Sequence, residues 1–248
     1  MRALFIQVYA VYRFNLRFWK EVFVPPYEYK EVLHQCWQVG LRSLSIISLT
    51  GFITGLVFTK QSRSSLAEFG ATSWLPSLMA IALLRALAPL VTALIIAGKV
   101  GSNIGAEIGS MRVTEQIDAM EVSSTNPFKY LVVSRVLAST LIVPILAVYM
   151  GFIGLLGAFV NVLRNEQTSF AAFFEQAFMR ITFLDLFVLL LKSAIYGYTI
   201  GMTGCFNGYN AEQGTVGVGR AANTSVVVSM FLIFIEEVLL VTLINTYR

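Results

Sequence analysis

Five long apolar segments constrain this chain more than any other feature. They cover about residues 38–59, 74–98, 136–163, 184–206 and 225–247. The hydrocarbon core of a bilayer takes roughly 20 apolar residues per spanning helix. The chain is 56% hydrophobic and only 13% charged, which is far from the composition of a soluble domain. The sequence therefore predicts an all-α integral membrane protein with five transmembrane helices, in which residues 1–248 form a single membrane domain.

Residues 1–37 differ from the five spans. Aromatic side chains between Phe5 and Phe23 are interleaved with Arg13, Arg17 and Lys20, and two prolines close the segment. Such a pattern is typical of an amphipathic helix that lies in the membrane interface, with its rings at headgroup depth and its bases toward anionic lipid. The alternative is a frayed, unstructured tail. We expect the interfacial helix.

Basic residues outside the spans predict the orientation of the chain. With five spans, the two termini lie on opposite faces. A cytoplasmic N-terminus collects most of these bases inside, namely Arg2, Arg13, Arg17, Lys20, Lys30, Lys99, Arg112, Lys129, Arg135 and Arg220. It leaves fewer outside, namely Lys60, Arg63, Arg164, Arg180 and Arg248. Since cytoplasmic loops carry an excess of Lys and Arg, we expect a cytoplasmic N-terminus and a C-terminus on the outer side.

The stretch from Gly98 to Arg135 is the one extended polar segment with a helical pattern. Its apolar residues recur at helical spacing, at Met111, Val113, Ile117, Met120 and Val122. Its acidic residues Glu115, Asp118 and Glu121 lie between them. The spacing predicts a short amphipathic helix from about Thr114 to Val122. Its apolar face would enter a groove on a soluble partner while the acids meet bases at the rim. The alternative is a plain solvated loop.

The connection between the third and fourth spans carries a second amphipathic pattern. Residues 164–183 form this outer-side loop, and the part from Thr168 to Phe183 is rich in Phe and Ala. We expect a short helix there, lying on the membrane surface.

Ionisable residues inside the spans are candidates for a functional site. Arg85 lies in the second span, Lys192 in the fourth, and Glu236 beside Glu237 in the fifth. Each would cost roughly 2.5–3.5 kcal/mol if it faced lipid alone, so each must pair or line a polar cavity. A Lys192–Glu236 pair is one solution, and it would leave Arg85 for an anionic group. The alternative is a set of purely structural ion pairs.

Small residues recur at spacings that favour close helix contact. Glycines are spaced by four or by three, as at Gly101, Gly105 and Gly109, at Gly151, Gly154 and Gly157, and at Gly197 and Gly201. In lipid, such residues allow backbones to touch. We interpret them as packing positions.

Motifs for catalysis are missing from the sequence. A single histidine, His34, excludes a His-Glu-x-x-His zinc site. The Gly98-Lys99 pair lacks the serine or threonine and the first glycine of a phosphate-binding loop. The chain is therefore expected to have no catalytic residues, metal or cofactor, and no nucleotide-binding motif of its own.

The central block of the sequence resembles the MlaE/YrbE permeases, the membrane subunits of MCE-type ABC lipid-transport systems. The resemblance rests on AGKVGSNIGAEIGSMRVTEQIDAMEV, on LLRALAPLVTALI before it, on the Asn126-Pro127 turn and YLVVSR after it, on Lys192-Ser193, and on Phe206-Asn207-Gly208-Tyr209. It covers nearly the whole chain. One difference is Ala86, because many family members carry Glu directly after the arginine that Arg85 matches.

This resemblance implies an assembly in the inner membrane. Two permease copies would form a homodimer, with a dimer of cytoplasmic ABC ATPases that uses the ATP and a ring of MCE-domain proteins on the outer side. A small cytoplasmic regulatory subunit is left open. The coupling loop would be 99–135, with coupling residues Thr114, Glu115, Gln116, Asp118 and Glu121. Membrane phospholipid or a related lipid would be the substrate, bound near Arg85, Lys192 and Glu236, and no nucleic acid is involved.

Three functions are compatible with these features. The first is a permease subunit that moves lipid between inner and outer membranes and is driven by a separate ATPase. The second is an ion-coupled secondary transporter of a lipid-like or anionic substrate that uses Arg85, Lys192 and Glu236. Such carriers usually show duplicated halves, and no repeat is visible here. The third is an intramembrane enzyme, which the missing nucleophile and metal motifs disfavour.

Overall fold

The computed structural model describes residues 2–25, 27–166 and 168–246, and this part of the chain is helical and holds no strand. Its short helices and turns are η1 (Thr72–Trp74), the π-helical segments η2 (Leu83–Leu87), η3 (Ala97–Gly101) and η4 (Phe128–Val133), α6 (Gln116–Val122) and α8 (Phe170–Phe178). Its other helices are α1 (Arg2–Val22), α2 (Tyr29–Glu68), α3 (Leu75–Ala82), α4 (Ala88–Ile96), α5 (Ser102–Val113), α7 (Ser134–Glu166), α9 (Phe183–Tyr209) and α10 (Thr215–Thr246). Arg248, one of the predicted outer bases, lies outside the described residues.

Five helical segments are long and apolar enough to cross a membrane, which confirms the predicted fold class. They are Tyr29–Glu68, Thr72–Val113, Phe128–Glu166, Phe183–Tyr209 and Thr215–Ile244. Several of them extend well past the apolar segments. The 40 residues of α2 are about 60 Å long at 1.5 Å per residue, against about 30 Å for a hydrocarbon core. Only the middle of such a helix must be apolar, because its ends can continue in water.

The chain divides into two compact units. Unit 1 holds Met1–Gly40, Ile96–Ile142 and Ile195–Arg248, and unit 2 holds Leu41–Ile95 and Val143–Ala194. The dividing points fall inside α2, α4, α7 and α9. The prediction of a single membrane domain stays a prediction.

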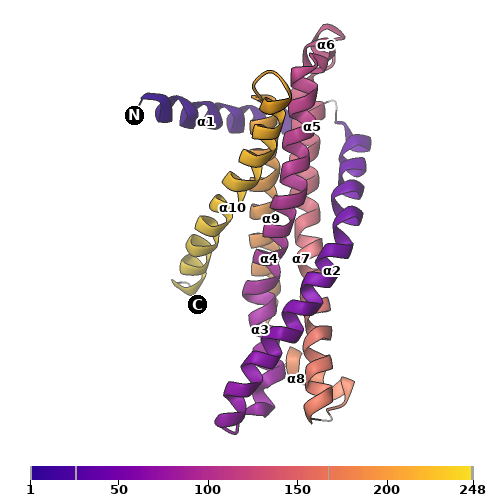
Figure 1. Cartoon of the computed structure of the whole chain (residues 1–248), viewed down its shortest axis with the longest axis vertical. Helices are drawn as coiled ribbons and strands as arrows, with labels where there is room; N and C mark the ends of the chain where they lie inside the picture. Colours follow the sequence, from indigo (N-terminus) through magenta and orange to yellow (C-terminus); the bar gives the residue numbers. More distant parts are fainter. Residues whose placement is uncertain (1, 26, 167, 247–248) are drawn as a thin grey trace. The chain divides into compact units, whose positions relative to one another are not determined.

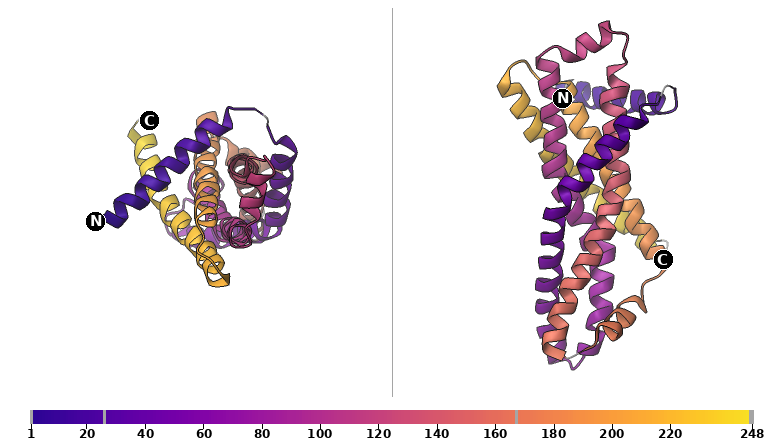
Figure 2. Two further views of the ribbon diagram at one scale, coloured as in Figure 1. Left: turned by 90° about the horizontal axis from the view of Figure 1, so that it is seen from above. Right: turned by 90° about the vertical axis from the view of Figure 1, so that its right-hand side faces the viewer.

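Helix α1 of unit 1 runs crosswise to α5 and α10, with α6 at the far end of α5 (Figures 1 and 2). Phe14 of α1 packs its ring against Phe128, Phe206 and Tyr209, with centroids 4.9, 5.4 and 6.2 Å away. Most other aromatic side chains of α1 are exposed, and Phe5 is 70% exposed. The predicted N-terminal amphipathic helix is therefore present, but it ends at Val22. Residues 29–37 of the predicted interfacial region 1–37 lie in the first turns of α2, after the two prolines that close the amphipathic pattern.

Close helix contacts organise the rest of unit 1. A Cβ atom on Gly105 would lie 2.5 Å from Ser225 Oγ of α10, and one on Gly197 would lie 2.4 Å from the Ser139 carbonyl oxygen of α7. These contacts confirm that the glycines are packing positions. They also explain why α10 begins at Thr215, ten residues before the apolar segment, because its small residues pack along α5.

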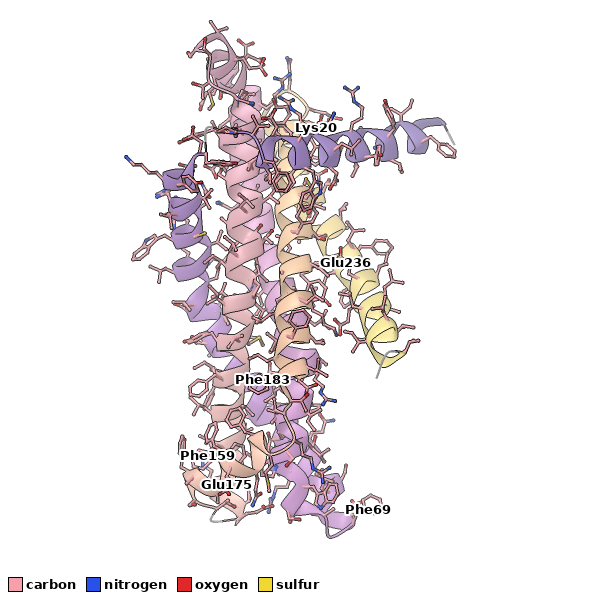
Figure 3. All side chains as sticks on the ribbon, turned by 180° about the vertical axis from the view of Figure 1, so that it is seen from behind. Lys20, Phe69, Phe159, Glu175, Phe183 and Glu236 are labelled. Atoms are coloured by element: carbon pink, nitrogen blue, oxygen red, sulfur yellow. The ribbon has the colours of Figure 1, made fainter. Side chains whose placement is uncertain are left out.

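Unit 2 is built around an apolar core that includes Leu75, Met79 and Leu83 of the second span and Leu155 of α7. Phe173 of α8 is fully buried in the same core. Figure 3 labels Phe159 of α7 and Glu175 of α8 close together at this end of the unit. The short helix predicted within residues 164–183 is present as α8 and packs against α3, while its location on the outer side of the membrane stays a prediction. Its N-cap is Ser169, whose hydroxyl accepts a hydrogen bond from the Ala172 amide at 3.3 Å.

Candidate functional site

The polar segment after the second span folds into two helices joined by a sharp turn. Helix α5 continues the second span to Val113, and Thr114 follows as its C-cap. Glu115 then adopts a left-handed backbone with φ 59° and serves as the N-cap of α6. The predicted helix is therefore present but begins at Gln116, and Thr114 and Glu115 form the turn before it. Left-handed conformations cost a non-glycine residue roughly 1–2 kcal/mol.

The end of α6 is a second sharp turn. The Thr125 amide donates to the Met120 carbonyl at 3.1 Å, and the Ser124 amide donates to the Glu121 carbonyl at 3.1 Å. Ser124 is left-handed, with φ 60°. This is a Schellman motif, usually completed by glycine. Non-glycine residues with positive φ therefore bracket α6 on both sides, and such strain tends to occur at functional sites.

The side chains of α6 divide between the protein and solvent. Ile117 is fully buried, and Val122 is 87% exposed. Asp118 Oδ1 lies 2.6 Å from Arg112 Nη1 of α5, so one of the three predicted acids already has a basic partner on its own chain. Glu115 and Glu121 are exposed. The helix thus presents an apolar side chain and two carboxylates to solvent.

The segment after α6 is hydrogen-bonded to the end of α1, to the α1–α2 connection and to the first turn of α2. Asn126 Nδ2 donates to Glu21 Oε2 at 3.1 Å. The Lys129 ammonium group, which is buried, donates to the Val24 carbonyl. Tyr130 Oη donates to Glu31 Oε2 at 3.1 Å. A displacement of α6 would therefore be felt at the start of the first span as well as along α5.

A buried arginine supports the same region from within. Arg135 has a side chain that is 3% exposed, and its Nη2 lies 2.8 Å from Glu107 Oε1 of α5. Its Nη1 donates to the Leu131 carbonyl at 3.0 Å. Sequence reasoning did not assign this pair, because the helical continuation of α5 through Glu107 was not foreseen.

In unit 2, Arg85 lies in the π-helical segment η2, a type of bulge that is frequent at functional sites. The sequence suggested that Arg85 could remain free for an anionic group, but the structure pairs it with Asp185. Its Nε lies 2.7 Å from Asp185 Oδ1, and its Nη2 donates to Asp185 Oδ2 at 2.9 Å. Asp185 thus gives Arg85 a carboxylate partner, although position 86, where many family members carry Glu, is alanine in this chain. A sequence signal that could have indicated Asp185 is the Thr-x-x-Asp pattern from Thr182, which is typical of a capping box at the start of a helix such as α9.

In unit 1, the acids of α10 lie against hydroxyl groups of α9. Thr199 Oγ1 donates to Glu236 Oε1 at 2.6 Å, and Figure 3 labels Glu236 on α10. Tyr196 Oη donates to Glu237, which explains how an acid at position 237 is accommodated. Lys192 is buried and belongs to unit 2, so the Lys192–Glu236 pair stays a prediction.

Fold and site together define a class: a multi-pass helical membrane protein with a short, exposed helix on the loop between its second and third spans. Comparison with known proteins identifies the family. A family model described as "Permease MlaE" matches residues 32–243, and the chain belongs to this permease family. It is a transport subunit.

Three relatives illustrate the match, each named "Probable ABC transporter permease protein". One from Rickettsia prowazekii (strain Madrid E) is 34% identical over 88% of this chain and 85% of its own length. One from Synechocystis sp. (strain PCC 6803) is 39% identical over 84% and 79%. One from Pyropia yezoensis is 35% identical over 84% and 80%. The protein is therefore an ABC transporter permease.

Proposed function

We propose that this chain is the membrane permease subunit of an ABC system that moves phospholipid or a related lipid between the inner and outer membranes. Its relatives are named as ABC transporter permeases, and such permeases work with ATPase subunits. The observation that carries the proposal is α6, a short helix with an 87% exposed valine, Val122, at its end. We infer that Val122, together with the exposed carboxylates of Glu115 and Glu121, forms the contact with a partner protein.

Helix α6 would transmit the ATPase motion as a rigid lever. It docks on a separate ATPase with Val122 in an apolar groove and with Glu115 and Glu121 against bases at the rim. Closure of the ATPase pair on nucleotide displaces α6. The bonds from Lys129 to Val24 of the α1–α2 connection and from Tyr130 to Glu31 of α2 then carry the displacement into the first span.

The proposed assembly is a homodimer in the inner membrane, with the N-terminus in the cytoplasm and a ring of MCE-domain proteins on the outer side. Only 11% of the apolar window of α10 is buried within one chain, which leaves its surface for lipid or for the second copy that we propose. Arg85, Lys192 and Glu236 are the proposed contacts for the lipid. Arg85 has a side chain that is 32% exposed, so its guanidinium can face a headgroup while it stays paired with Asp185.

Docking is tested by purifying the whole complex through a tag on this chain and quantifying the ATPase that remains bound. Val122→Asp places a charge where an apolar contact is proposed, and Glu115→Lys reverses a rim charge. We expect both variants to insert normally and to lose most of the ATPase. The matched control is Val216→Asp, since Val216 is 75% exposed but lies on α10. A full complement of ATPase on the Val122→Asp complex would refute docking through α6.

The lipid substrate is tested by mass spectrometry of phospholipid that copurifies with the intact complex. Arg85→Ala should lower the phospholipid content and the rate of lipid transport between vesicles. Arg220→Ala is the control, because its partner Glu212 and its own side chain are both well exposed. Unchanged lipid content and transport in Arg85→Ala would remove Arg85 from the site.

A further inference from the structure

A second polar site lies in unit 2, on the C-terminal side of a very close contact between α2 and α7. A Cβ atom on Gly55 would lie 1.8 Å from the Gly154 carbonyl oxygen, and one on Gly157 would lie 2.3 Å from the Phe52 carbonyl oxygen. The two backbones therefore touch at this level. One turn further on, at Lys60 of α2, the side chains become long and polar.

A cavity of about 310 Å³ opens directly beyond this contact. Its lining residues are Lys60, Arg63, Ser64, Ala67, Asn161 and Asn165. The volume is at the lower end of the range of about 300–1,000 Å³ for small-molecule sites. Hydrogen-bond donors dominate the lining: an ammonium, a guanidinium, a hydroxyl and two amides. No carboxylate lines the cavity among the described residues. This composition fits an anion.

Two side chains of the cavity have capacity for a ligand. Arg63 contacts Glu166 only through Nε, at 3.5 Å, which is long for a charge-assisted bond. Asn161 Oδ1 is buried and has no hydrogen-bond partner among the described residues. An asparagine amide can be turned so that its NH₂ group takes the place of its oxygen. In that orientation Asn161 would donate into the cavity.

The position along the chain places the cavity at the membrane surface. In α2, the apolar run that ends at Phe58 is followed directly by Lys-Gln-Ser-Arg-Ser-Ser from Lys60. In α7, the apolar run ends at Leu163 and is followed by Arg164. Polar residues that begin where an apolar span ends lie at headgroup depth. An anion at this depth is most readily a lipid phosphate.

We propose that the cavity between the C-terminal parts of α2 and α7 is a phosphate-binding site that takes the headgroup of an anionic phospholipid. Lys60 and Arg63 supply the charge, and Ser64, Asn161 and Asn165 supply neutral donors. Helix C-termini carry partial negative charge and repel anions, so binding depends on these side chains and not on the helix ends. The site stands independently of the proposed lipid transport, since a phosphate site would remain if another substrate were carried.

The experiment measures retained lipid on purified full-length protein. The protein is exchanged into detergent micelles that contain dioleoyl phosphatidylglycerol, washed, and extracted for mass spectrometry. A parallel arm titrates inorganic phosphate by calorimetry. The variants are Lys60→Ala and Asn161→Asp, and the matched control is Arg164→Ala, which removes a positive charge on α7 outside the cavity. Each protein is first checked by its thermal unfolding midpoint.

We expect Lys60→Ala to lower phosphatidylglycerol retention about tenfold, as for loss of a charge-assisted contact, while Arg164→Ala retains lipid like the wild type. Asn161→Asp should lower retention by repulsion, and it decides the question if Lys60→Ala does not fold. Saturable phosphate binding without lipid retention, lost in the same variants, would still support the site and identify its ligand as free phosphate. Equal losses in Lys60→Ala and Arg164→Ala, or no loss in either cavity variant, would overturn the proposal.

Discussion

Arg85 and Asp185 form a two-pronged ion pair, with Nε 2.7 Å from Oδ1 and Nη2 2.9 Å from Oδ2. Asp185 is almost fully buried, whereas the Arg85 side chain is 32% exposed. The same carboxylate accepts hydrogen bonds from the amide and the hydroxyl of Thr182, both at 2.9 Å. One carboxylate therefore both caps α9 and pins it to the π-helical segment of the second span.

The first prediction concerns the stability of this pair. Asp185→Ala should lower the free energy of unfolding by about 1–3 kcal/mol, less than for a fully buried pair because water screens Arg85. The double variant Arg85→Ala/Asp185→Ala should be less unstable than the sum of the single variants predicts. Thermal unfolding in detergent, followed by tryptophan fluorescence, measures these differences.

The exposed pair Arg112–Asp118 is the control for the first prediction. Its side chains are 41% and 55% exposed, so its removal should cost less than about 1 kcal/mol. If loss of Asp185 lowered the free energy of unfolding no more than loss of Asp118, the Arg85–Asp185 pair between η2 and α9 would not stabilise the fold.

The second prediction concerns the backbone contact between α2 and α7 in unit 2. Gly55→Ala should destabilise the protein strongly, because its Cβ would collide with the Gly154 carbonyl and backbone cannot move aside as a side chain can. Gly219→Ala is the matched control. Among the described residues, and apart from the backbone of its own helix and its chain neighbours, no atom lies within 4 Å of its added Cβ, so we expect a gain of up to about 1 kcal/mol from helix propensity. Comparable unfolding midpoints for the two variants would contradict the close contact.

The third prediction concerns the strained turn before α6. Glu115→Gly should raise stability by about 1 kcal/mol, because glycine adopts a positive φ without cost. Glu115→Val should lower it, since a β-branched residue is poorly tolerated there. Hydrogen exchange of the α5–α6 amides measures both effects. Faster exchange in Glu115→Gly than in the wild type would show that the turn is not strained.

The fourth prediction separates two roles of Asp118. Asp118→Arg should weaken ATPase retention, either because a rim contact is lost or because the Arg112 pair is broken. The double reversal Arg112→Asp/Asp118→Arg restores the internal pair but not the charge offered to the partner. We expect the double variant to remain defective in copurification. Full recovery would mean that Asp118 acts only through Arg112.

The sequence by itself determined the membrane class, the number of spans, the presence of an amphipathic N-terminal helix and the presence of a helix in the polar loop. These features depend on local composition and on the helical spacing of apolar residues, and the sequence contains both. Ends of helices were less well predicted, because polar residues continue α2 and α10 far past the apolar segments. The glycine spacing predicted close contacts but not the partners.

Only the tertiary structure decided which charges meet. Asp185 pairs with a residue 100 positions earlier, and Glu107 pairs with Arg135 after an intervening turn. Side chains within hydrogen-bond reach across helices are set by helix rotation and depth, which no local pattern encodes. The left-handed backbone at Glu115 was equally hidden, because that position carries none of the residues that usually favour it. It is imposed by the need to turn α6 away from α5 while Ile117 stays buried.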